Sequence, residues 1–196
     1  TRCLSDWSSD VCSSDLAIEH LTKAWRILDD TGDAVGAAKM LNNVGLAYRA
    51  QGRLPRAIDA LRTALKLAEE SGDRILVTRV LSNLGWTYVT AGDDDKALPA
   101  LQEALTSSQR ANDPIGVLAA LQHFGEALVR SGRPAEAIPY LEDALMRHRK
   151  LHYRRYEAET LELLADALAA VGRSADGEAR RAEARAILRE LDRRRP

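Results

Sequence analysis

The sequence predicts an all-α solenoid, a fold in which pairs of antiparallel helices stack on one another. The first observation is an eight-residue motif that returns every 40 residues without a slip, beginning at Leu41, Leu81, Leu121 and Leu161. The second is the spacing of apolar residues at three and four positions, which indicates helices with one buried face. The third is the regular placement of glycine and proline between these stretches. A fixed period of this size is the sequence signature of repeat architectures.

The first full repeat predicts two helices, over about 34–50 and 54–70. Gly52 lies where a helix ends in a left-handed residue, and Pro55 lies where the next helix can begin. Gly72 closes the second helix. Loops this short make consecutive helices antiparallel neighbours. The face of the first helix that we expect to be buried carries Ala37, Leu41, Val44, Ala47 and Tyr48.

The 40-residue register divides the whole chain. We expect the final helix, about 175–191, to need a two-residue insertion that aligns Ala179, Ala186 and Ile187, and to act as a cap with a wetter outer face. The tail from Asp192 should be disordered. The segments are a non-native segment (1–16), the second helix of a truncated repeat (17–33), four repeats (34–73, 74–113, 114–153 and 154–192, the last with its capping helix) and the tail (193–196).

The first sixteen residues differ in composition from the rest. They are rich in serine and aspartate and hold both cysteines, Cys3 and Cys12. Residues 6–16 resemble a translated short-read sequencing adapter, so we expect this segment to be non-native and the chain to be a fragment. Disulfide and zinc chemistry then have no cysteine to use. Without this segment the chain is close to electrically neutral, which gives no global attraction to nucleic acid.

Glycine inside the first helix of each repeat needs a physical reason, because it costs roughly 1 kcal/mol relative to alanine. It occurs at Gly45, Gly85 and Gly125, with Ala165 in the last copy. We expect this glycine to let the first helix come close to a small residue at the start of the second helix. The proposed partners are Ala57, Ala97 and Ala137.

The pattern Leu-x-x-Val/Leu-Gly-x-x-Tyr, then Gly, then Ala-x-x-x-Leu-x-x-Ala-Leu, resembles the tetratricopeptide repeat over about residues 17–192. The usual unit has 34 residues and opens with Trp, whereas this one has 40 and opens with Leu. The longer form is similar to the repeats of kinesin light chains and of actinobacterial multidomain regulators. The resemblance implies a right-handed superhelix whose first helices line a concave groove.

The implied groove residues lie between the buried positions of each first helix. They form a peptide-binding set without catalytic or metal-binding members. The set is Lys39, Asn42, Asn43, Leu46, Arg49, Arg79, Ser82, Asn83, Trp86, Gln122, His123, Glu126, Arg130, Glu159, Glu162 and Asp166.

Two interpretations of the groove remain open at this point. Asn43 and Asn83 could bind an extended peptide backbone, because an amide both donates and accepts, or they could bond locally within the repeat. Trp86 could anchor a ligand or pack against a neighbouring helix. The set is basic early and acidic late in the chain, which could orient a ligand with its acidic or C-terminal end toward the early repeats, or could be a solvated polar face.

No catalytic signature occurs, so we expect no enzyme and no cofactor. His148 and His152 stand four apart but lack a third ligand, which favours exposed surface histidines over a metal site. The basic stretch 147–156 is better explained as a solvated turn than as a nucleic-acid contact. No apolar run is long enough to cross a membrane.

We therefore expect a cytoplasmic, non-catalytic scaffold that binds a protein or peptide, or other domains of its own full-length chain. The resemblance to the repeats of actinobacterial multidomain regulators implies the sensor region of a larger bacterial regulator. The alternatives are a stand-alone adaptor or a signalling-peptide receptor, and direct binding of nucleic acid is least favoured.

Overall fold

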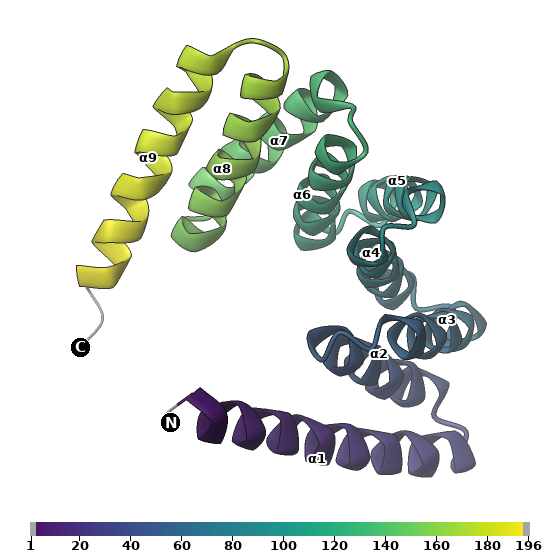
Figure 1. The fold of residues 1–196 in the computed structure, drawn as a ribbon. Helices are drawn as coiled ribbons and strands as arrows, with labels where there is room; N and C mark the ends of the chain where they lie inside the picture. Colours follow the sequence, from purple (N-terminus) through teal and green to yellow (C-terminus); the bar gives the residue numbers. More distant parts are fainter. Residues whose placement is uncertain (1–2, 194–196) are drawn as a thin grey trace. The chain divides into compact units, whose positions relative to one another are not determined.

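The computed structural model describes the backbone of residues 3–193 and the side chains of residues 15–193. Every regular element in this range is an α-helix (Figure 1). The helices are α1 (Cys3–Asp30), α2 (Ala34–Ala50), α3 (Leu54–Ser71), α4 (Arg74–Ala91), α5 (Asp94–Arg110), α6 (Pro114–Arg130), α7 (Pro134–Lys150), α8 (Arg154–Ala170) and α9 (Ser174–Arg193). Within this range, no helix combines the length and the apolar composition needed to cross a bilayer.

The chain forms two compact units, residues 1–103 and 104–196, and α5 runs from one into the other. In the first unit α2 packs against α1, α3 and α4. In the second unit α8 packs against α6, α7 and α9. We call α2, α4, α6 and α8 the A helices and the others the B helices. Within each unit two A helices therefore lie side by side.

Short polar caps begin three A helices. The side chains of Asp33, Asp73 and Asp113 accept hydrogen bonds from backbone N–H groups in the first turn of α2, α4 and α6. Such caps satisfy donors that have no partner inside the helix. Most helix ends carry a glycine with φ between +71° and +83°. Asn112 (φ +51°) and His152 (φ +56°) take this left-handed conformation without being glycine.

In the first three hairpins, the core is a stripe of alanine and leucine on the B helix. In α3 it comprises Ala57, Leu61, Ala64 and Ala68, all with 0% exposure. The same positions are equally buried in α5 (Ala97, Leu101, Ala104) and in α7 (Ala137, Leu141, Ala144).

The helical glycines face leucine, which corrects the expected alanine partner. A Cβ at Gly45 would lie 2.5 Å from Leu61 Cγ, and one at Gly85 would lie 2.6 Å from Leu101 Cγ. The carbonyl oxygen of Ala57 lies farther from the same Cβ position, at 3.3 Å. The leucine, one turn beyond the alanine, is seated directly over the glycine.

The last hairpin keeps the 40-residue register, so the predicted insertion in α9 is wrong. Gly177 and Ala184 are buried, 40 residues after Ala137 and Ala144, whereas Ala179 and Ala186 are exposed. A Cβ at Gly177 would meet the carbonyl oxygen of Ala165 at 2.8 Å. In the last hairpin the A helix therefore carries the alanine and the B helix carries the glycine, the reverse of the first three hairpins.

The ends of the chain also differ from expectation. Helix α1 begins at Cys3 instead of near residue 17, and Asp15 accepts hydrogen bonds from Gln51 (2.9 Å) and Arg53 (3.2 Å). The side chains of residues 1–14 lie outside the described part, so the non-native origin of 1–16 stays a prediction. Residues 192 and 193 belong to α9, which corrects the expected disorder there, and 194–196 are outside the described residues.

Candidate functional site

In the first unit, a hollow of about 450 Å³ lies between the A helices α2 and α4. We call it the basic hollow, because its charged lining residues are Lys39 and Arg79. On each of the two helices the lining residues are three or four positions apart and so share a face, and the packing of α2 against α4 brings the two faces together. The lining comprises Lys39, Met40, Asn42, Asn43, Leu46, Leu76, Arg79 and Asn83, six of which the sequence predicts.

Asparagines join the two helices beneath this hollow. The amide nitrogen of Asn83 donates to the side-chain oxygen of Asn42 at 2.8 Å, and Asn42 is only 5% exposed. Asn42 therefore lines the hollow as a largely buried residue whose amide is satisfied across the helix pair. Asn43 is exposed and lies one turn after Lys39. Of the predicted asparagines, Asn43 is the one best placed to meet a ligand.

Three predicted residues of this unit do not line the basic hollow. Ser82 is buried at 5% exposure. Arg49 is half-buried, and this burial lowers the pKa of its guanidinium, one of whose terminal nitrogens has no hydrogen-bond acceptor. Trp86 is half-buried outside the lining.

In the second unit, a hollow of about 290 Å³ lies between the A helices α6 and α8. We call it the acidic hollow, because four of its lining residues are carboxylates. His123 and Arg130 were predicted in this unit but do not line it. The lining comprises Gln122, Glu126, Glu159, Glu162, Leu163 and Asp166.

The acidic hollow disfavours negative charge. Burial raises the pKa of the Glu126 carboxyl, and the negative charge of Glu159 raises it further, while Arg130 opposes the shift. Glu159 accepts from Arg155 at 3.3 Å, and Asp166 accepts from Arg181 at 2.5 Å. A cationic group entering this hollow would relieve the repulsion and favour the ionised form of Glu126.

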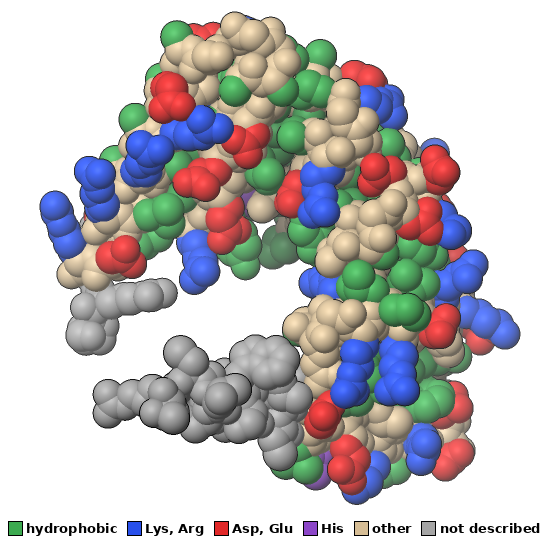
Figure 2. Space-filling model, in the orientation of Figure 1, with side chains coloured by type: hydrophobic (Ala, Val, Ile, Leu, Met, Phe, Trp, Pro, Cys, Tyr) green, Lys and Arg blue, Asp and Glu red, His purple; other side chains and the backbone are tan. Residues whose placement is uncertain are grey.

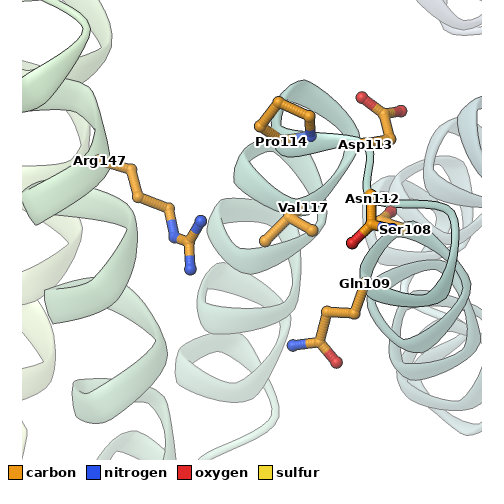
Figure 3. A pocket seen from close by; sticks show the side chains of 7 residues that line it. All are labelled: Ser108, Gln109, Asn112, Asp113, Pro114, Val117 and Arg147. Carbon is orange, nitrogen blue, oxygen red and sulfur yellow. The ribbon is translucent and has the colours of Figure 1, made fainter.

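A third hollow, of about 370 Å³, was not predicted from the sequence (Figure 3). Its lining comprises Ser108, Gln109, Asn112, Asp113, Pro114, Val117 and Arg147. Several of these groups already serve the fold, because Ser108 donates to a backbone carbonyl and Asp113 caps α6. Arg147 projects from α7 toward α6 and pairs with Asp143 at 2.8 Å. From the sequence, the only feature predicted around this hollow is the cap at the start of α6.

His148 is buried at 2% exposure, which corrects the expected exposed histidine. Its Nδ1 lies 3.0 Å from the Thr160 hydroxyl oxygen, and its ring stacks on Tyr156. His152 lies beyond the end of α7 in the left-handed turn. Among the described residues, no three acidic, histidine or cysteine side chains are grouped in a way that could hold a metal ion.

The basic stretch 147–156 forms ion pairs instead of a simple solvated turn. Arg149 and Arg154 both donate to Glu157, at 3.1 and 2.6 Å, and the Glu157 side chain is only 3% exposed. Arg149 also pairs with Glu183, and Arg154 with Glu190, both on α9. Along α9, acidic side chains lie among the basic side chains (Figure 2). Interspersed signs favour ion pairing over binding of a polyanion.

Two family models match the chain, over residues 36–110 and 117–152, and both describe the tetratricopeptide repeat. The chain belongs to the tetratricopeptide repeat family. This agrees with the repeat pattern and with the stacked helix hairpins of each unit. The fold of this family is generally a non-catalytic scaffold for protein–protein interaction. No curated protein matches the chain.

Solved structures of tetratricopeptide repeats resemble the chain. A putative kinesin light chain repeat protein from Podosopora anserina is 18% identical with a TM-score of 0.74, covering 97% of this chain and 93% of that one. A Rap protein in complex with competence and sporulation factor is 17% identical with a TM-score of 0.74, covering 92% and 52%. A signal-transduction ATPase with a tetratricopeptide repeat sensor from Pyrococcus horikoshii is 18% identical with a TM-score of 0.74, covering 91% and 28%. Identities this low establish a shared fold only.

Proposed function

We propose that this tetratricopeptide repeat chain binds an extended peptide segment on the faces of its A helices. The observation that carries the proposal is the pair of hollows, one in each unit, lined by polar side chains of two adjacent A helices. Most of these lining residues also follow from the sequence register. Concave sites with a few convergent polar groups are the usual places where ligands bind.

The two hollows favour ligand groups of opposite charge. In the basic hollow, Lys39 and Arg79 favour a carboxylate, and Asn43 can donate to or accept from the peptide backbone. In the acidic hollow, Glu126, Glu162 and their neighbours favour lysine or arginine. Complementary charge of this kind contributes to specificity and association rate more than to affinity.

The biological setting that we favour is the sensor region of a larger bacterial regulator. The similar Rap and ATPase structures support it, because this chain spans only 52% and 28% of their lengths. A stand-alone adaptor is the alternative, supported by the kinesin light chain repeats, of which this chain spans 93%. The genomic reading frame upstream separates the two: a phosphate-binding loop and a helix-turn-helix there support the regulator.

A random dodecapeptide library displayed on phage tests the binding proposal. Peptides selected on the wild-type chain are then measured by isothermal titration calorimetry against Arg79→Glu and Glu162→Lys. Reversal in either hollow should weaken binding of peptides that use it by at least about tenfold, which is about 1.4 kcal/mol. Arg62→Glu is the matched control, because Arg62 is exposed on the B helix α3. Equal affinity for all four proteins would refute the proposal.

A further inference from the structure

The third hollow is separate from the two hollows that the peptide proposal uses. It is bounded by the end of α5, the turn that follows it, the start of α6 and Arg147 of α7 (Figure 3). All its lining residues belong to the second unit, and none of them lines the basic or the acidic hollow. A ligand bound here would therefore be independent of a peptide bound in those two hollows.

The same junction occurs 40 residues later, where α7, α8 and α9 meet, and there side chains fill it. The ring of His148 stacks on Tyr156, and the buried carboxylate of Glu157 accepts from Arg149 at 3.1 Å. The residues at the corresponding positions of the open junction are all smaller: Ser108, Gly116, Val117 and Gln109. The hollow of about 370 Å³ is therefore the space that a stacked ring and its neighbours occupy in the next repeat.

Arg147 provides a flat, positively charged surface at this hollow. It stands where the filled junction has Ile187. Its Nε donates to Oδ1 of Asp143 at 2.8 Å, and its Nη2 donates to Oδ2 at 3.2 Å. Two parallel hydrogen bonds fix the plane of the guanidinium and offset much of its charge. Because a planar guanidinium stacks on aromatic rings, the group that projects toward α6 (Figure 3) can cover a ring in the hollow.

The polar groups around the hollow favour a neutral ligand over an anion. Asp113, which caps α6, adds a negative charge, and Arg147 is already paired with Asp143. The side chains of Gln109 and Asn112 are exposed, and their amides can both donate and accept hydrogen bonds. A hydroxyl group also does both, so it matches these amides.

We propose that this hollow binds a neutral aromatic ring that carries a hydroxyl group, as in the side chain of tyrosine. The ring lies on Val117, which is 6% exposed and forms an apolar floor, and the guanidinium of Arg147 covers its face. The hydroxyl bonds to the amide of Gln109, which lies across the hollow from Arg147 (Figure 3). The chain makes the same kind of contact within itself, with Arg56 5.9 Å from the ring centroid of Tyr48 and Lys96 5.7 Å from that of Tyr88.

The probes are N-acetyl-tyrosinamide, N-acetyl-phenylalaninamide and N-acetyl-leucinamide, each titrated into the whole chain. The methyl signals of Val117 in NMR spectra report binding, because a ring that lies on this valine shifts them. The tyrosine probe should bind most tightly, the phenylalanine probe about threefold more weakly, and the leucine probe at least about tenfold more weakly. p-Cresol identifies the source of the ring: binding equal to that of the tyrosine probe indicates a free phenol, and weaker binding indicates a tyrosine within a peptide.

Two substitutions test the named contacts. Arg147→Ile copies the residue of the filled junction and should weaken binding of the tyrosine probe by at least about fivefold. Gln109→Ala should remove the advantage of the tyrosine probe over the phenylalanine probe. Gln109 is exposed, so this variant tests the site even if Arg147→Ile disturbs folding. Lys150→Ile is the matched control, because Lys150 is an exposed residue of α7 outside the lining, and it should leave binding unchanged.

Three results would overturn the proposal: a tyrosine probe that leaves the Val117 methyl signals unshifted, one that binds no more tightly than the leucine probe, or equal binding by Arg147→Ile and the wild type. Arg79→Glu and Glu162→Lys, which reverse charges in the other two hollows, should bind the tyrosine probe as the wild type does. Failure of this proposal is therefore distinguishable from failure of the peptide proposal.

Discussion

At the residue scale, the repeated glycine and its leucine determine how closely each hairpin packs. The sequence made the glycine visible, because a glycine inside a helix is costly and this one recurs with the period. It could not identify the partner, because Ala57 and Leu61 lie one turn apart on the same face of α3. The longer side chain of Leu61 reaches the glycine, and the repeat register alone does not show this. The last hairpin supports this account, since Arg181 replaces the leucine where Ala165 replaces the glycine.

Replacing Gly85 by alanine should destabilise the chain although alanine favours helix. The added Cβ would lie 2.6 Å from Leu101 Cγ. Overpacking of this kind costs about 1–3 kcal/mol, against a gain in helix propensity of roughly 1 kcal/mol. Urea unfolding of Gly85→Ala, Leu101→Ala and the double variant measures the coupling. The double variant should be more stable than the sum of the single effects predicts, and strict additivity would contradict the contact.

His148 should make stability depend on pH. Burial lowers the pKa of its imidazole, while Glu157 opposes the shift, so the folded value lies below the unfolded value of about 6.5. The unfolded chain then binds more protons, and the stabilisation present above pH 6.5 is lost as the pH falls through this value toward the folded pKa.

The unfolding free energy should therefore fall less between pH 7 and pH 5 in His148→Gln than in the wild type. Urea titrations at several pH values measure this difference. His20→Gln is the control, because His20 is exposed on α1. If His148→Gln retained the full wild-type slope, buried His148 would not be the titrating group.

At the element scale, the helices were predictable and their last hairpin was not. The residues 34–50 that the periodicity assigns to a helix are those of α2, because caps and glycines punctuate the repeat. In α9, alanines at 179, 182 and 186 made several registers equally plausible from sequence. Only packing identifies Gly177 as the residue that meets Ala165. The sequence also did not reveal that Arg149 and Arg154 both pair with the buried carboxylate of Glu157.

The turn between α7 and α8 offers a stabilising substitution. His152 has φ +56°, whereas the corresponding turns at Gly32 and Gly72 use glycine. A left-handed conformation costs a non-glycine residue roughly 1–2 kcal/mol, which replacement by glycine removes. Part of this gain is lost again, because glycine has more conformational freedom in the unfolded chain. Thermal unfolding of His152→Gly should show a gain of about 0.5–1 kcal/mol. Asn112→Gly should gain less, since asparagine tolerates this conformation, and an equal or larger gain there would contradict the explanation.

At the scale of the whole molecule, the family and the candidate ligand faces follow largely from the sequence. The register predicted most residues of both hollows, because A-helix residues between the buried positions must face outward. It did not show that Asn42 and Ser82 are buried. Whether a polar residue faces a ligand or a neighbouring helix depends on how adjacent repeats pack, which one repeat's pattern does not encode.

Photo-crosslinking tests most directly where the ligand binds. A library-selected peptide carrying benzophenone at successive positions is irradiated with the wild-type chain, and the attachment sites are mapped by mass spectrometry. Crosslinks should concentrate on α2 and α4 around Lys39, Asn43 and Arg79, and on α6 and α8 around Gln122 and Glu162. Crosslinks that concentrate instead on the B helices α3 and α7 would contradict binding on the A-helix faces.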